Sequence, residues 1–292
     1  MMEIHQLRMF QSIVECGSMV QAAQQLHCVP SNVTTRIKQL EQELGTELFH
    51  REGKRLQLTA SGEIFLGYCH KILALCDEAK QSVHPDAPPS GPLKIGAIES
   101  SATTRLPHLL AKFHQLYPDV SVQIITGTWK QLLLDVSQHK LDGAIVAGNI
   151  EFPLLNKLNI YQEDMVLIAP PSFDEIRCQE DLIGKEIFMW TEGCPYRAAL
   201  EAWLKLKNIS LPITSITSYT TIIGCVSAGS GVSLVPKSIY EQYKHYAHFK
   251  GYAFKQLSSM QNIFFWHQNI HHHKARDAFL SLIQSEFSPS LA

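Results

Sequence analysis

The stretch that most constrains the fold is residues 18–40, SMVQAAQQLHCVPSNVTTRIKQL, which predicts two short helices joined by a tight turn. Ser18 is a good N-cap residue, and apolar side chains then recur on one helical face. Pro30 can occupy only a turn or a first helical position. Beyond it an apolar stripe with i, i+4, i+7 and i+11 spacing marks a second helix, through Val33, Ile37, Leu40 and Leu44. Such a pair with a polar outer face is typical of a helix-turn-helix, whose second helix enters the DNA major groove; a surface pair of amphipathic helices is the simpler alternative.

Residues 48–58 continue with the pattern of a β-hairpin, because residues 52–54 suit a turn and Leu56 and Leu58 alternate after it. Basic side chains gather at its tip, where the wing of a winged helix-turn-helix would reach DNA phosphates. The residues expected to contact DNA are Ser31, Asn32, Thr34, Thr35, Arg36 and Lys38 on the second helix, with Arg51, Lys54 and Arg55 on the hairpin.

A long helix is expected after Thr59, over residues 60–83. Apolar residues recur along it at spacings of 3, 4, 3 and 4, in the series Phe65, Tyr68, Ile72, Leu75 and Ala79. This is the heptad pattern of a helix that pairs with a second copy of itself. The alternative is a single helix that packs on its own domain.

The charge of residues 1–90 opposes simple DNA binding, because eight Lys and Arg stand against ten Asp and Glu, a formal net charge of −2. DNA-binding domains usually carry a basic excess. The conflict is resolved if the acidic residues lie apart from the DNA-binding surface. Glu41, Glu43 and Glu47 indeed follow the recognition segment in the sequence. We therefore expect moderate nonspecific binding that weakens as salt rises.

A linker with four prolines, residues 84–92, separates this part from the rest. Strands and helices alternate after it, which predicts an α/β domain with mostly parallel sheets. Two such sets, joined by crossings near residues 163 and 267, predict two lobes with a cleft between them. The expected domains are 1–60 for DNA binding, 61–91 for the linker helix and hinge, and 92–292 for the two lobes, with lobe I at about 92–163 and 267–292 and lobe II at about 164–266.

Ligands in open α/β sheets bind beyond the carboxyl ends of the strands. That rule selects four segments, whose candidate effector-binding residues are Ser100, Ser101, Thr103, Thr128, Gly193, Cys194, Tyr196, Arg197, Tyr219, Thr220 and Thr221. Helix N-termini, hydroxyl groups and the Arg197 guanidinium together favour a small carboxylate. As the alternative, the hydroxyl residues are plain N-caps and Arg197 is a surface ion-pair partner.

The first 60 residues resemble the DNA-binding domain of LysR-type transcriptional regulators, which are bacterial winged helix-turn-helix proteins. The matching segments include LRMF at 7–10, AAQQL at 22–26, NVTTRIKQLE at 32–41, ELG at 43–45, LFHR at 48–51 and LTASG at 58–62. This chain has Pro30 where the family often has Gln, so base contacts assigned to that Gln do not carry over. The segments around residues 193–197 and 223–229 look like a subgroup with a cysteine and an arginine at this helix start.

The resemblance implies an effector domain of periplasmic-binding-protein architecture and a homodimer or homotetramer. Its DNA site would be an inverted repeat with half-sites about one helical turn, or a multiple of it, apart. It also implies a small-molecule effector and contact with RNA polymerase. It names neither the effector nor the target genes, and it does not decide between activator and repressor.

Other functions have weaker support. Cys194 could be a redox sensor, with a thiol pKa lowered by a helix N-terminus and by Arg197, and Cys225 as resolving partner. Three adjacent histidines, 271–273, point about 100° apart on a helix and cannot share one metal ion comfortably. No phosphate loop, Rossmann fingerprint or nucleophile elbow indicates an enzyme, and no cofactor is predicted. The scattered cysteines, and the lack of an 18-residue apolar run or signal peptide, favour a cytoplasmic protein without membrane contact. The remaining alternative is a metabolite-binding protein whose helix-turn-helix contacts protein instead of DNA.

Overall fold

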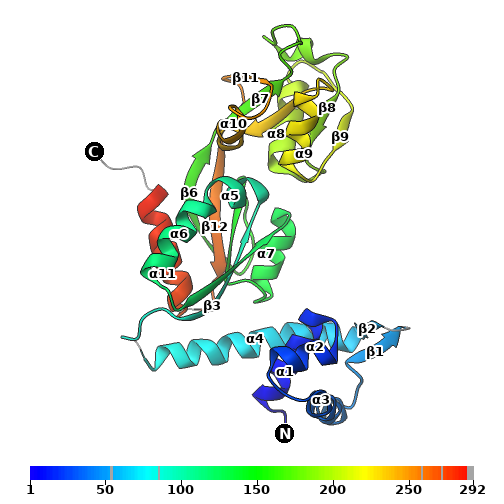
Figure 1. The fold of residues 1–292 in the computed structure, drawn as a ribbon, viewed down its shortest axis with the longest axis vertical. Coiled ribbons are helices and arrows are strands. Elements are labelled where there is room, and N and C mark those ends of the chain that lie inside the picture. The colour runs from blue at the N-terminus through cyan, green and yellow to red at the C-terminus, as the bar shows by residue number, and fades with distance from the viewer. Residues whose placement is uncertain (53–54, 85, 258, 271, 288–292) are drawn as a thin grey trace. The chain divides into compact units, whose positions relative to one another are not determined.

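The computed structural model describes residues 1–52, 55–84, 86–257, 259–270 and 272–287 (Figure 1). They form two compact units, the first made mainly of residues 1–87 and the second mainly of the residues after Ala87. The elements of the first unit are α1 (Ile4–Cys16), α2 (Met19–Gln25), α3 (Pro30–Leu44), β1 (Phe49–Glu52), β2 (Arg55–Leu58) and α4 (Ala60–Ser82).

The first unit has one hydrophobic core, to which all four helices contribute. The ring of Phe10 on α1 lies at its centre, 5.2 Å from the ring of Phe49 and 5.1 Å from that of Phe65. Val33, Ile37 and Leu40 of α3 are buried in it, as the spacing predicts, but Leu44, the last residue of the helix, is exposed. Pro30 occupies the first turn of α3, where its missing N–H leaves no helical bond unmade.

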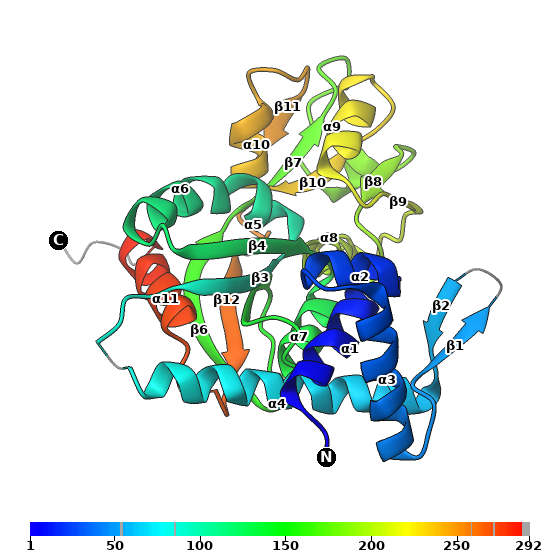
Figure 2. The ribbon, with the colours of Figure 1, turned by 60° about the horizontal axis from the view of Figure 1, so that its bottom comes forward.

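Two glycines fix how the first unit's elements join. Gly45 ends α3 with φ of +67°, in the left-handed region that favours glycine. Gly62, in the first turn of α4, allows close backbone approach, because a Cβ there would lie 2.2 Å from the carbonyl oxygen of Leu48. The antiparallel hairpin of β1 and β2 starts from this junction and projects beyond the helices (Figure 2).

Lobe I of the second unit is built on a five-stranded sheet in the order β4-β3-β5-β12-β6. These strands are β3 (Gly91–Ala97), β4 (Val120–Thr126), β5 (Gly143–Ala147), β6 (Leu155–Glu163) and β12 (Met260–His267). Helices α6 (Leu106–Leu116) and α11 (Lys274–Phe287) cover one face and α7 (Trp129–Ser137) covers the other (Figure 1). The short helix α5 (Glu99–Thr104) directly follows β3.

Lobe II contains the remaining elements, which are β7 (Met165–Ala169), the 3-10 helix η1 (Gln179–Leu182), β8 (Ile187–Met189), α8 (Pro195–Lys205), β9 (Ile213–Ser215), α9 (Tyr219–Ser227), β10 (Ser233–Pro236), α10 (Lys237–Tyr243) and β11 (Lys250–Tyr252). β7 lies between β10 and β11, and β8 pairs with β9. Its main core packs Leu167, Leu200, Trp203 and Leu234 together.

The expected crossing near residue 267 is wrong. Strand β12 pairs with β5 and β6 over residues 260–267, so it belongs to the lobe I sheet. The chain therefore returns from lobe II just before Met260, and lobe II ends there instead of at residue 266. A run of apolar residues, Ile263 to Trp266, gave no sign of which sheet it would enter.

The sheets are also less parallel than predicted. β3 runs parallel to β4 and β5, but β12 runs antiparallel to both of its neighbours, and β7 runs antiparallel to β10 and β11. Helices α5 and α6 are separated at Arg105 and do not run on as one helix. Pro107 explains the division, because it has no N–H to donate to the carbonyl of Thr103 and a continuous helix would need that bond.

Candidate functional site

The outer face of α3 carries the polar residues predicted to contact DNA. Ser31, Asn32, Thr35 and Lys38 are exposed. The Thr34 hydroxyl donates to the carbonyl of Pro30 at 3.0 Å, and its side chain is half-buried against α2. An exposed polar surface on a buried apolar stripe is the arrangement that a recognition helix requires.

Arg36 differs from its neighbours because it has a partner within the unit. Its guanidinium lies 3.2 Å from the Glu3 carboxylate, with 38% and 53% of the two side chains exposed. An exposed pair of this kind contributes about 0–1 kcal/mol, so it can open. Arg36 therefore stands at the edge of the α3 surface, with its charge partly neutralised.

The structure confirms that Arg51 and Arg55 lie on the two strands of a hairpin, and their contact with DNA stays a prediction. Arg51 lies on β1 opposite Leu56, and Arg55 lies on β2 opposite Glu52. Lys54 falls outside the described residues.

The predicted seam of α4 is only partly correct. The Phe65 ring packs edge-on against Phe10, and Ile72 packs on the same core, so neither faces away from the unit. Tyr68, Leu75 and Ala79 are exposed, as are Ile64 and Val83, which lies one residue beyond the helix. As far as the described residues show, these five form a second, unpartnered stripe. We call these five residues the α4 stripe. The heptad count placed core residues and stripe residues in one series, since both recur every three or four positions.

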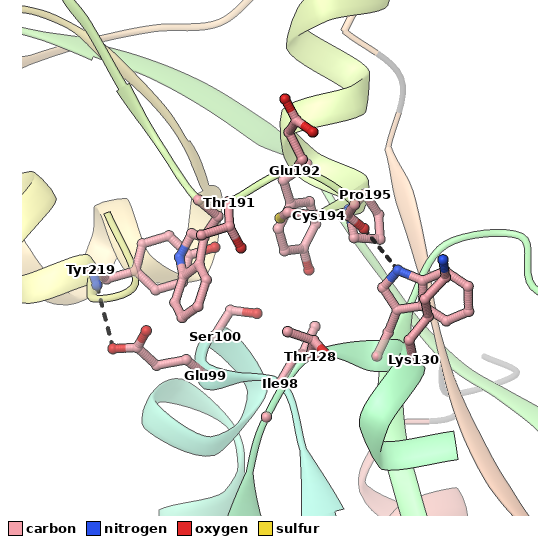
Figure 3. Close-up of a pocket in the computed structure, with 15 residues that line it drawn as sticks. Ile98, Glu99, Ser100, Thr128, Lys130, Thr191, Glu192, Cys194, Pro195 and Tyr219 are labelled. Atoms are coloured by element: carbon pink, nitrogen blue, oxygen red, sulfur yellow. Dashed lines mark hydrogen bonds between the residues drawn. The ribbon is translucent and has the colours of Figure 1, made fainter. Parts of the chain in front are cut away.

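A cavity of about 160 Å³ lies between the lobes of the second unit, at the carboxyl ends of the strands. Segments after β3 and β4 line it from lobe I, and the segment after β8 and the start of α9 line it from lobe II (Figure 3). Of the predicted effector-binding residues, the cavity brings together Ser100, Thr128, Gly193, Cys194, Tyr196 and Tyr219.

Two hydrogen bonds cross between the lobes at this cavity, and both are drawn in Figure 3. The indole N–H of Trp129 on α7 donates to the carbonyl of Gly193 at 2.7 Å. The backbone N–H of Tyr219, at the start of α9, donates to Oε1 of Glu99 at 3.3 Å. A change in the angle between the lobes would break or reform these bonds.

Arg197 does not line the cavity, which removes the main basis for expecting a carboxylate. Its guanidinium is nearly buried, donating to Glu201 at 2.7 Å, to Ser215 at 2.9 Å and to the carbonyl of Trp190 at 3.2 Å. The alternative of a surface ion-pair partner is right about the pairing with Glu201 but wrong about the position, because Arg197 is buried. Its i, i+4 spacing with Glu201 was visible in the sequence.

Four other predicted residues lie outside the cavity. Ser101 is buried, with its hydroxyl 2.8 Å from that of Tyr161. Thr103 lines a second, polar cavity of about 770 Å³ beside Arg105 and Glu163. Thr220 and Thr221 are exposed on α9, whose N-cap is Ser218. Strand ends are correctly identified by the rule for α/β sheets, but the rule cannot tell which residue of a segment turns inward.

Two family descriptions match the chain: the LysR substrate binding domain at residues 86–288, and the bacterial regulatory helix-turn-helix protein of the lysR family at residues 4–63. The chain belongs to the LysR family of transcriptional regulators. The HTH-type transcriptional regulator YusT of Bacillus subtilis is 38% identical over 265 residues, covering 90% of this chain and 89% of YusT. GltR of the same organism is 35% identical over 98% of this chain and 97% of its own.

The fold of this LysR-type regulator is also found in solved structures. A full-length OxyR from Pseudomonas aeruginosa, carrying one cysteine-to-aspartate substitution, superposes with a TM-score of 0.79 at 22% identity, covering 97% of this chain and 95% of OxyR. At that identity the likeness shows the fold alone.

Sequence reasoning missed several residues that line the cavity of this regulator. They are Ile98, Glu99, Gly127, Trp129, Lys130, Trp190, Thr191, Glu192 and Pro195. Most of them lie in or beside the four segments that the rule for strand ends selects. Within those segments, only residues with hydroxyl groups, Arg197 and the helix start before it were predicted to bind the effector. The signal that could have found Glu99 is its position directly after a buried strand.

Cys194 lies at the N-cap of α8, but its thiol is not activated in this regulator. Burial raises its pKa above the ordinary value, and this effect exceeds the opposing influence of the helix N–H groups and Arg197. The low-pKa thiol expected of a peroxide sensor is therefore not present. Cys225 is a free, half-buried cysteine.

Metal and membrane sites have no support among the described residues. No cluster of His, Cys, Asp and Glu there could hold a metal ion, and His271 lies outside that part of the chain. Within the same residues, none of the helices has the length and apolar character to cross a membrane.

Proposed function

We propose that this LysR-type regulator controls transcription in response to a small molecule that binds between the two lobes of its second unit. The observation that carries the proposal is the cavity crossed by the Trp129–Gly193 and Tyr219–Glu99 hydrogen bonds. A ligand there touches both lobes and competes with, or reinforces, the bonds that join them. It alters regulation by its differential affinity for the two lobe arrangements.

The carboxylate class of effector, expected from the sequence, loses the support of Arg197, although the start of α8 and two hydroxyl residues still line the cavity. What remains of that prediction is a small molecule near Ser100 and Thr128, whose hydroxyls both donate and accept hydrogen bonds. The chemical class is argued separately below.

We further propose that two copies pair through the α4 stripe. Five exposed apolar or small side chains, four on α4 and one directly after it, are more than isolated surface residues, and pairing would remove them from water. A symmetric dimer presents two α3 helices and so reads an inverted repeat. Contact with RNA polymerase would follow from the role of a transcriptional regulator.

DNA binding is tested by selection of duplexes from a random pool with the purified full-length chain. We expect an inverted repeat whose half-sites lie about one helical turn, or a multiple of it, apart. Binding should weaken steeply as salt rises. Recovery of no preferred sequence, with binding insensitive to salt, would favour a metabolite-binding protein whose helix-turn-helix contacts other proteins.

Pairing is tested by the double substitution Tyr68→Lys with Leu75→Lys, whose side chains are 60% and 63% exposed. The variant should keep its thermal stability and fall to half the mass in light scattering. Glu63→Gln, at an exposed position on another face of the same helix, serves as control. An unchanged mass in the double variant would exclude pairing through the α4 stripe.

The redox alternative has less support, because burial raises the Cys194 pKa. Peroxide titration with mass spectrometry distinguishes a regulator that senses oxidants through Cys194 from one that responds to a bound small molecule. Oxidation of Cys194 at low peroxide, with a change in DNA binding, would restore the redox hypothesis. Catalysis is the least supported class, since the relatives are named as transcriptional regulators.

A further inference from the structure

The charges around the interlobe cavity are not arranged for an anion. Three charged side chains line it, namely Glu99, Lys130 and Glu192. Lys130 and Glu192 are exposed, with 92% of the Glu192 side chain in solvent. Glu99 is the one withdrawn from water, so the interior of the cavity is acidic.

One oxygen of the Glu99 carboxylate has a hydrogen-bond partner, and the other has none among the described residues. Oε1 accepts the hydrogen bond from the Tyr219 N–H, whereas Oε2 is buried and has no hydrogen-bond partner among the described residues. A buried carboxylate oxygen without a donor is unfavourable, because it has lost its hydrogen bonds to water. A ligand that donates a hydrogen bond to Oε2, and carries positive charge, would relieve this.

The walls beside Glu99 are aromatic. The rings of Trp190 and Tyr219 lie 5.7 Å apart, and both line the cavity with Trp129 and Tyr196. Aromatic faces attract cations through their quadrupole, most strongly for Trp, and they accommodate an apolar body equally well. A carboxylate placed here would face an acidic group and the negative faces of the rings.

We propose that the effector is an organic ammonium ion: a small molecule whose protonated amine donates to Glu99 and whose apolar body lies between the aromatic walls. The inference rests on the proposed function, because it names the ligand class of the same cavity. A cavity of about 150 Å³ is enough to hold benzene, so a body of one ring suits this one. The ammonium group would join the Glu99–Tyr219 contact and thereby favour the lobe arrangement described above.

The test uses the full-length chain and three probes of matched shape, which are 2-phenylethylamine, 3-phenylpropanoate and 2-phenylethanol. Binding is measured by calorimetry at neutral pH, where these are cationic, anionic and neutral. We expect saturable binding of the amine, with at least a tenfold weaker affinity for the alcohol and the carboxylate.

Two variants with the same change of charge locate the interaction. Glu99→Gln keeps an oxygen that accepts from the Tyr219 N–H and removes the charge, so it should weaken amine binding at least tenfold. Glu192→Gln removes an exposed charge at the cavity mouth and should change the affinity less than threefold. Equal effects of both variants would mean general electrostatic attraction and would overturn the proposal.

Each further outcome separates this inference from the proposed function. Tighter binding of the carboxylate, competing with the amine, would overturn the ammonium class and leave an interlobe effector site intact. Absence of binding by all three probes, in a protein that still selects an inverted repeat, would overturn the inference and leave DNA regulation standing. If Glu99→Gln does not fold, the ranking of the probes on the unmodified chain still decides between cation and anion.

Discussion

The two units of this regulator differ in how their parts are joined. In the first unit, contacts near and far along the chain surround one apolar core, from the Glu41–Leu48 hydrogen bond, seven residues apart, to the Arg8–Asp77 ion pair, 69 residues apart. In the second unit, hydrogen bonds such as that between Glu99 and Tyr219, 120 residues apart, join two lobes. The lobes bury separate clusters of apolar side chains and meet partly through such polar bonds. A unit of the first kind presents a fixed surface, whereas one of the second kind can change shape for a small free energy.

The largest effect is expected from Phe10→Ala, which tests whether the two units unfold separately. Phe10 is fully buried at the centre of the first unit, so we expect its free energy of unfolding to fall by about 3–5 kcal/mol. All four tryptophans lie in the second unit. In urea, the loss of helical circular dichroism should begin earlier while the tryptophan fluorescence transition stays in place. A shift of both would show that the units unfold as one, and Leu75→Ala, at an exposed site, should change neither.

The next largest effect is expected at the second, polar cavity. Arg105 in lobe I lies 3.1 Å from Glu163, whose side chain is 5% exposed and also accepts from the Ser238 N–H in lobe II. Arg105→Ala leaves a nearly buried carboxylate short of a donor and should destabilise the second unit by about 1–3 kcal/mol, read from tryptophan fluorescence in urea. Lys112→Ala, which removes an exposed ion pair with Glu286, should have an effect below about 1 kcal/mol.

A smaller difference is expected in the salt dependence of DNA binding between two basic residues of α3. Lys38 is exposed, whereas Arg36 is paired with Glu3. Loss of one phosphate contact lowers the salt slope of DNA binding by about 0.9. We expect Lys38→Ala to reach that value for each half-site and Arg36→Ala to fall short of it, in fluorescence anisotropy titrations at several salt concentrations. Equal slopes would mean that the Arg36–Glu3 pair opens on DNA.

The smallest effect concerns pH. Burial raises the pKa of Glu99 above its ordinary value of 4.5, so the fold disfavours the ionised carboxylate. Stability is therefore lost as pH rises through the raised pKa, and Gln cannot ionise. Glu99→Gln should melt slightly above the unmodified protein at neutral pH, and the gap should close as pH falls to 4.5 and below. A gap that is constant with pH would assign the effect to packing.

Features set by the local sequence could be predicted, whereas features set by contacts between distant segments could not. The helices of residues 18–44 were predictable because their caps, proline and apolar spacing are all local. β6 was missed because it is an edge strand with polar residues and little alternation. The segments of the cavity were predictable from the strand order, but the inward residue in each was not. Arg197 was expected in the cavity and Glu99 was not, because side-chain direction depends on partners such as Ser215 and Tyr219, which belong to other elements.

The contact at Gly62 has a mechanical consequence. The Leu48 carbonyl accepts from the Thr59 N–H at 3.0 Å, and the Gly62 N–H donates to the Thr59 hydroxyl at 3.0 Å, so the hairpin base and the first turn of α4 meet in one short, hydrogen-bonded junction. Because the junction is so short, a rotation of α4 is passed on to the hairpin. In a paired regulator, a small turn of α4 would swing each wing by a distance that grows with the length of the hairpin.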